Sequence, residues 1–287
     1  MLPYLDLGFL KISLYIPLFT IGFLLALIFV MKIGRKIGLS GKLTVIAGIY
    51  GILGLILGAK LVYMFTRLPD VFKDIHSFGL VLKNDTLGAL DFLFGGLVYY
   101  GGLIGFCMGI CLFSKRYGFN RLNILDLCTP FFPMAHAFGR VGCFCEGCCY
   151  GVEYHGFLSV TYPYNDSHPE LSSVPRFPVQ LLEAAMNTVC FVILFSILMK
   201  ELKKKVGERR LRQGQLLGIY FAYYLVARFL LELLRGDAIR GAIGMFSTSQ
   251  FISILMIPIT VYLLQARQTK PIFYLSNADE NPVSEDF

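Results

Sequence analysis

The chain has 287 residues, of which 56% are hydrophobic and only 16% are charged. Soluble domains carry charged residues at about a quarter of their positions, so this composition excludes an ordinary soluble domain and indicates a surface that faces lipid. The net charge of +7 does not indicate nucleic-acid binding, because most basic residues gather in alternate loops between apolar segments. These loops are residues 32–42, 115–121, 200–212 and 267–270.

Apolar segments follow one another along the chain. About 20 apolar residues are needed for a helix to cross roughly 30 Å of hydrocarbon. The expected spans are residues 12–31, 43–65, 92–113, 122–139, 178–199, 214–234 and 247–266. The expected fold class is therefore an all-α integral membrane protein with about seven transmembrane helices. No cleavable signal peptide is expected, because residues 12–31 are too long for a signal-peptide core and no small-residue cleavage site follows them.

The alternation of basic loops predicts how the chain is oriented. Cytoplasmic loops carry the excess of Lys and Arg, so the N-terminus is expected outside and the C-terminus inside. Residues 141–178, rich in Gly, Pro, Ser, Tyr and Asn, are expected to form a small extracytoplasmic cap of loops and short strands. Residues 1–270 are predicted to form a single polytopic domain, and residues 271–287 a polar cytoplasmic tail without fixed structure.

The sixth span carries charges that lipid would not accept. Tyr224, Arg228, Glu232 and Arg235 follow at helical spacing, within about 80° of arc on one face of a helix. An Arg at the bilayer centre costs at least about 2.5 kcal/mol, so this face is expected to point into the bundle. Glu232 can pair with one arginine and leave the other to bind an anion. The alternative is a structural ion-pair network that locks helices together.

A third intramembrane arginine, Arg140, lies at the outer end of the fourth span, between Gly139 and Gly142. The glycines let backbone or ligand approach closely, and a guanidinium group binds phosphate with two hydrogen bonds. The alternative is an arginine that only extends to the lipid headgroups. Together with the arginines of the sixth span, Arg140 predicts a site for a lipid phosphate.

The third span begins with a glycine-rich segment, residues 94–105, at the same outer level. Small residues at Gly95, Gly96 and Gly105 favour close packing between helices. Tyr100, next to Gly101 and Gly102, is a candidate to project its phenol into a cavity. The alternative is an ordinary aromatic residue of the membrane interface.

The eight cysteines fall into two groups. Those within spans are expected to act as small apolar residues: Cys107, Cys111, Cys128 and Cys190. The others form a cluster just outside Arg140: Cys143, Cys145, Cys148 and Cys149. Outside the membrane a disulfide staple is the favoured interpretation. A zinc site and a thiol activated by Arg140 are the alternatives, although the cysteine spacing is not a standard zinc motif.

In order and position these motifs resemble those of the prolipoprotein diacylglyceryl transferases of bacterial inner membranes. Residues 139–151 (GRVGCFCEGCCYG) are similar to the family signature, residues 100–105 (YGGLIG) to its His-Gly-Gly segment and residues 178–183 (PVQLLE) to its Pro-Ser-Gln-Leu-Tyr-Glu stretch. The Tyr, Arg, Glu and Arg of the sixth span match the family's penultimate helix. Tyr15 lies where the family has a functional tyrosine.

The resemblance implies transfer of the diacylglyceryl group of phosphatidylglycerol to the lipobox cysteine thiol of prolipoproteins. It implies a monomeric multi-pass protein of the bacterial cytoplasmic (inner) membrane, with no cofactor, no metal and no nucleic-acid partner. The implied catalytic residues are Arg140, Arg228, Tyr100 and Tyr15. The implied substrate-binding residues are Arg140, Gly101, Gly102, Gly139, Gly142, Cys143, Gly151, Tyr224, Glu232 and Arg235.

The chain departs from the family pattern at three positions. Tyr100 replaces the family histidine, Cys143 an asparagine and Cys148 a glutamate. Two alternatives to the implied function remain. The chain can be a divergent member that uses a phospholipid donor with another acceptor, the cysteine cluster contributing directly, or a non-enzymatic lipid-binding membrane protein.

Overall fold

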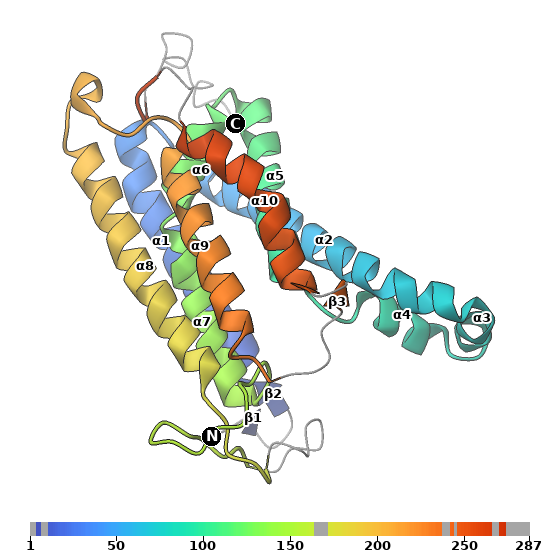
Figure 1. The fold of residues 1–287 in the computed structure, drawn as a ribbon. Coiled ribbons are helices and arrows are strands. Elements are labelled where there is room, and N and C mark those ends of the chain that lie inside the picture. Colours follow the sequence, from blue (N-terminus) through green and yellow to red (C-terminus); the bar gives the residue numbers. More distant parts are fainter. Residues whose placement is uncertain are drawn as a thin grey trace. The chain divides into compact units, whose positions relative to one another are not determined.

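A computed structural model of the chain describes residues 4–6, 11–163, 172–236, 242–243, 246–265 and 270–273. Within these residues the protein is mainly helical (Figure 1). Two short antiparallel ladders are also present, β1 (Tyr4–Asp6) with β2 (Lys11–Ser13) and β3 (Ala242–Ile243) with β4 (Phe246–Ser247). The expected helical class is therefore confirmed, with these strands as an addition.

Three helices in the described part of the chain are long and apolar enough to cross a membrane. They are α1 (Tyr15–Gly34) with its 3-10 extension η1 (Arg35–Ile37), α2 (Gly41–Lys73) and α8 (Val179–Leu202). A fourth crossing results if α4 (Thr86–Phe94) and α5 (Tyr99–Tyr117), which bend by 78° at their junction, form one broken span. The protein is therefore a membrane protein, and the count of seven spans stays a prediction.

The remaining helices are shorter. They are α3 (Ile75–Asn84), α6 (Arg121–Cys128), α7 (Phe131–Glu146), η3 (Val206–Glu208), α9 (Gln215–Glu232) and α10 (Thr248–Leu264). Two of the predicted spans are not single helices. Residues 92–113 are interrupted between α4 and α5, and residues 122–139 are interrupted between α6 and α7, where Pro130 precedes the first residue of α7. Proline lacks a backbone donor, which favours a helix boundary there.

The helices fall into two compact units, of which the first contains residues 1–33 and 126–274. In Figure 1, α7, α8 and α9 of this unit lie side by side, and α10 packs against α9. Aromatic rings hold the helices together, as Phe131 of α7 stacks on Phe29 of α1 at 5.8 Å and meets Phe195 of α8 at 6.2 Å. Small residues permit the close contacts, since a Cβ at Gly218 would lie 3.0 Å from Leu263.

A buried carboxylate caps the first turn of α9. Gly214 precedes this helix with φ of 86° and offers no side chain to its free N–H groups. Asp126, fully buried in α6, accepts hydrogen bonds from Gly214 N at 2.6 Å and Leu217 N at 3.0 Å. The acidic residue that interrupts the predicted fourth span therefore satisfies helix donors that would otherwise be unpaired.

The second unit contains residues 34–125 and is built around glycine contacts between α2 and α5. A Cβ at Gly54 would lie 2.1 Å from Gly105 O, and a Cβ at Gly58 would lie 2.2 Å from Gly101 O. Such contacts are possible only without side chains, so the two backbones touch. The predicted packing role of Gly105 is confirmed, and Gly101 shares it.

Residues 270–273 contact the loop after α8. Ile272 is fully buried, and its N–H donates to Leu211 O at 2.9 Å. Arg209 Nη1 donates to Ile272 O at 2.9 Å. Residues 274–287, the greater part of the predicted tail, lie outside the described residues, and both the tail and the single domain over residues 1–270 stay predictions.

Candidate active site

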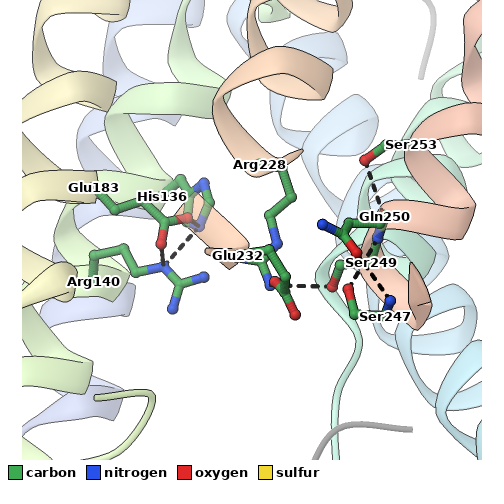
Figure 2. A network of polar contacts seen from close by, with 9 residues as sticks. All are labelled: His136, Arg140, Glu183, Arg228, Glu232, Ser247, Ser249, Gln250 and Ser253. Atoms are coloured by element: carbon green, nitrogen blue, oxygen red, sulfur yellow. Dashed lines mark hydrogen bonds and ion pairs between the residues drawn. The ribbon is translucent and has the colours of Figure 1, made fainter. Parts of the chain in front are cut away.

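A buried charged cluster joins α7 to α8 in the first unit (Figure 2). Arg140 Nε lies 2.9 Å from Glu183 Oε2 and 3.2 Å from His136 Nε2, and His136 Nε2 lies 3.4 Å from Glu183 Oε1. Arg140 follows His136 by one helical turn, and Glu183 belongs to the second turn of α8. Arg140 is 8% exposed and Glu183 2% exposed, so the ion pair is shielded from water. Glu183 thereby offsets the cost of burying the guanidinium charge.

This arrangement leaves the two terminal amino groups of Arg140 available to bind a ligand. Both of its polar contacts within the described residues use Nε, so its two terminal amino groups make no hydrogen bond there. These amino groups are the pair of donors with which arginine binds a carboxylate or phosphate. The contact with Glu183 therefore orients Arg140 and still leaves donors for an anion.

A second charged cluster joins α9 to α10. Arg228 Nη2 lies 2.5 Å from Glu232 Oε2 and donates to Ser249 Oγ at 3.1 Å. Nη1 of Arg228 is buried and has no hydrogen-bond partner among the described residues. A buried, unpaired guanidinium N–H is costly, which favours an anionic partner. The predicted pairing of Glu232 with an arginine is confirmed for Arg228.

The two clusters are neighbours within one helical unit. The ring of His136 lies 5.8 Å from the ring of Tyr224, which is one turn before Arg228 on α9. Arg228 is close enough to act electrostatically on both His136 and Glu183. In Figure 2, Arg228 and Glu232 lie between the Arg140–Glu183–His136 cluster and Ser249 of α10. The predicted arginines of the fourth and sixth spans therefore border the same buried region.

Arg235 is placed differently from the prediction. Helix α9 ends at Glu232, so Arg235 does not belong to the helical face of Tyr224 and Arg228. Instead its backbone pairs with that of Gly151, and the flanking bond from Val152 N to Leu234 O measures 3.0 Å. Its charge still acts on His136 and Glu183. Arg235 thus comes to the site from a loop.

The predicted glycines of this unit have packing roles that the structure makes visible. A Cβ at Gly142 would lie 2.9 Å from Tyr15 Cα, and a Cβ at Gly151 would lie 2.3 Å from Phe177 O. A Cβ at Gly139 would meet only Phe19, at an ordinary 3.6 Å. Gly142 therefore lets α1 approach α7, and the phenol of Tyr15 acts electrostatically on Arg140.

Three predicted residues belong to the second unit. Tyr100 is buried near the start of α5, Gly101 packs against Gly58, and a Cβ added at Gly102 would lie 3.4 Å from Leu55 Cγ. Tyr100 is 3% exposed, so its side chain is covered by protein, and the alternative of an ordinary interface aromatic stays untested. A catalytic role for Tyr100 and a binding role for Gly101 and Gly102 stay predictions.

The cysteine segment has no disulfide in the part of the chain that the structure describes, since none of the eight cysteines is disulfide-bonded there. The favoured interpretation of a disulfide staple is therefore wrong for this structure. The sulfur atoms of Cys143, Cys148 and Cys149 instead gather within 4.8 Å of one another. Hydrogen bonds with the Cys143 and Cys148 thiols hold the pKa of the Cys149 thiol well below its usual range, and hydrogen bonds with Cys143 and Cys149 raise the pKa of the Cys148 thiol.

Sequence reasoning did not place Glu183, His136 or Gln180 among the site residues. Gln180, fully buried in the first turn of α8, donates through Nε2 to Cys148 O at 2.9 Å. It thereby ties α8 to the cysteine segment. The sequence does contain a signal for Glu183. It is the one acidic residue of the predicted span 178–199, and intramembrane charges are usually functional.

Comparison with known proteins places these features in a family. The family model for prolipoprotein diacylglyceryl transferases matches residues 3–266. The chain is 31% identical over 249 residues to phosphatidylglycerol–prolipoprotein diacylglyceryl transferase 2 of Clostridium perfringens, with 86% of this chain and 88% of the relative covered. It is 32% identical over 254 residues to the enzyme of that name from Clostridium tetani, with 88% and 92% covered. The chain therefore belongs to the prolipoprotein diacylglyceryl transferase family.

Proposed function

We propose that this protein transfers the diacylglyceryl group of phosphatidylglycerol to the lipobox cysteine thiol of a prolipoprotein. The observation that carries the proposal is the pair of buried arginines, Arg140 and Arg228, whose ion pairs leave guanidinium donors without a partner among the described residues. The names of the relatives state the same donor and acceptor.

The reaction makes one bond and breaks one. The acceptor sulfur forms a bond to the glyceryl carbon, and the bond from that carbon to the phosphate oxygen breaks. The electron pair stays on the departing glycerol phosphate, and the thiol proton leaves to solvent or to a base. Negative charge therefore builds on the phosphate oxygen as the reaction proceeds.

Arg140 and Arg228 are suited to stabilise that charge. Their donors face a region from which water is largely excluded, where hydrogen bonds to a developing charge are stronger than in water. An interaction that strengthens in the transition state raises the rate, whereas equal binding of substrate and transition state does not. Glu183 and Glu232 act as positioning residues, each holding one arginine in place.

The other predicted residues receive supporting roles in the proposal. Tyr15 lies beside Arg140 and is assigned to orient the phosphate. Tyr224, whose ring lies 5.8 Å from that of His136 and is tilted against it, is assigned to border the bound phosphate. Arg235 supplies further positive charge from the loop side. Tyr100, in place of the family histidine, is assigned an orienting role because a phenol of pKa about 10 is a weak base at neutral pH.

The membrane setting of the proposal follows the sequence predictions. We propose a multi-pass protein of the bacterial cytoplasmic membrane that crosses seven times, with the N-terminus outside and the C-terminus inside. In this proposed topology Arg140 would lie buried at the outer end of the fourth span, on the side where precursor lipoproteins arrive after translocation. The protein is proposed to act as a monomer.

Complementation tests the proposal. The chain is expressed in cells depleted of their own transferase, and the mass and membrane anchoring of a model lipobox precursor are followed. Modification is expected for the wild type, loss of modification for Arg140→Ala and Arg228→Ala, and retention for Arg210→Ala, an exposed arginine of the same unit. An unmodified precursor, with the wild-type chain folded in the membrane, would contradict the proposal.

A further inference from the structure

The three gathered thiols form a site that the transfer reaction as described does not use. Cys143 is buried, and Cys148 and Cys149 are half-buried. The three Sγ atoms lie within 4.8 Å of one another. Zinc–sulfur bonds of about 2.3 Å place the sulfurs of a tetrahedral site about 3.8 Å apart, so the cluster needs to contract by no more than about 1 Å.

The local backbone builds this cluster from cysteines that are not neighbours in sequence. Helix α7 ends with Gly147 at φ of 77°, and the two closing bonds run from Cys148 N to Cys143 O and from Gly147 N to Phe144 O. This Schellman motif brings the side chains of Cys143 and Cys148 together, as it usually does for an apolar pair. Cys149 then adopts a positive φ of 59°, rare for a residue with a side chain.

The charges around the cluster suit a metal–thiolate group. Arg140 acts electrostatically on Cys143 and Cys149, and Arg235 acts on Cys149. Three thiolates and one divalent cation carry a net charge of −1, which these guanidinium groups would stabilise. Soft thiolate ligands select zinc and copper(I) over the hard cations magnesium and calcium.

We propose that Cys143, Cys148 and Cys149 form a Zn²⁺ site whose fourth coordination position accepts the thiol of the acceptor protein. Among the described residues the group of ligand atoms that all lie within 4.8 Å of one another holds these three cysteines, and Glu146 Oε2, 3.8 Å from Cys148 Sγ, lies outside it. Zinc sites with three protein ligands and an open position are the type found in catalytic rather than structural centres. The open position gives the cluster a place for an incoming ligand.

The transfer reaction requires that the acceptor thiol lose its proton, and an open zinc position would promote this step. This half of the inference rests on the proposed function. A thiol that coordinates zinc loses its proton to solvent and becomes a thiolate. The coordinated sulfur then attacks the glyceryl carbon, the carbon–oxygen bond breaks, and the electron pair leaves with the phosphate. No oxidant or reductant is required. Zinc would thereby activate the acceptor in a chain where Tyr100 replaces the histidine.

Metal content measures the first half of the inference without lipid or activity. Protein purified in detergent with a reductant is loaded with Zn²⁺, desalted and analysed for zinc per chain. One equivalent is expected for wild type and for Cys145→Ser, a cysteine of the same segment outside the cluster. Loss of stoichiometric zinc is expected for Cys143→Ser, Cys148→Ser and Cys149→Ser. Equal zinc content in all variants, or a Cys143–Cys148 disulfide in protein isolated without reductant, would overturn the site.

Co²⁺ bound in place of Zn²⁺ has a visible spectrum that depends on its ligands, so it can detect a ligand that binds at the fourth coordination position. The visible spectrum of the Co²⁺-loaded protein is expected to change on addition of a lipobox peptide with cysteine and to stay the same with the serine peptide. Identical spectra with both peptides would refute thiol coordination. Transfer that continues unchanged after zinc is removed would overturn the inference and leave the proposed function standing. Thiol binding without any transfer would keep the site and contradict the proposed function.

Discussion

Neutralising Glu183 tests whether the buried arginine pair is held ready for an anion. The change Glu183→Gln keeps the shape of the side chain and removes the carboxylate that lies 2.9 Å from Arg140 Nε. Arg140, only 8% exposed, then carries a buried charge without its counterion. Removing one partner of a buried ion pair costs about 3–5 kcal/mol, and the remaining hydrogen-bond capacity of Gln moves the expected loss of stability to the lower end of that range.

A lipid headgroup with a net negative charge should relieve this penalty, because its phosphate is not already balanced by a cationic group. Thermal unfolding is measured in detergent with added phosphatidylglycerol or phosphatidylcholine. In phosphatidylcholine, Glu183→Gln is expected to unfold at a clearly lower temperature than wild type, and phosphatidylglycerol is expected to restore more stability to the variant than to wild type. The matched control is Glu153→Gln, whose carboxylate is 62% exposed and whose change should alter stability by less than about 1 kcal/mol. Equal stability of Glu183→Gln and Glu153→Gln would refute the account of a buried ion pair.

Three further changes address the scaffold. Asp126→Asn weakens the two hydrogen bonds that cap α9 and should lower the free energy of unfolding by about 1–2 kcal/mol. Asp85→Asn, at an exposed helix cap, should cost less, and equal costs would contradict the buried cap. Gly142→Ala places a Cβ 2.9 Å from Tyr15 Cα and should reduce diacylglyceryl transfer while the helix content stays the same. Gly207→Ala, whose Cβ would have no atom within 4 Å, should leave transfer unchanged. Unchanged transfer in Gly142→Ala would remove Tyr15 from the site. Gly101→Ala should lower the free energy of unfolding more than Gly102→Ala. The Cβ added at position 101 would lie 2.4 Å from Gly58 O, whereas the Cβ added at position 102 would lie 3.4 Å from Leu55. The reverse order of stability would favour a ligand-binding role.

The buried arginines could be predicted from the sequence because a charged side chain in the bilayer has a high free energy unless a polar or anionic group pairs with it. Arg140 and Arg228 stood out against an apolar background, and helical spacing placed Tyr224 and Glu232 beside Arg228. The same rule applies to Glu183, but a single carboxylate near the end of a span also resembles an interface residue. Only the structure shows that it faces Arg140.

Other features depend on where helices stop, which periodicity does not reveal. Arg235 continues the helical spacing of its segment in sequence, yet α9 ends at Glu232 and a loop contact with Gly151 places it. The bend between α4 and α5 likewise lies inside one apolar segment. The gathering of Cys143 with Cys148 needed the helix end at Gly147, so spacing alone did not suggest it.

The central claim is that Arg140 and Arg228 bind one lipid phosphate. Its most direct test is an experimental structure of the protein with phosphatidylglycerol bound. The account predicts phosphate oxygens within about 3 Å of the terminal nitrogens of both guanidinium groups. A headgroup that contacts one arginine alone, with the other turned to a separate surface, would contradict it.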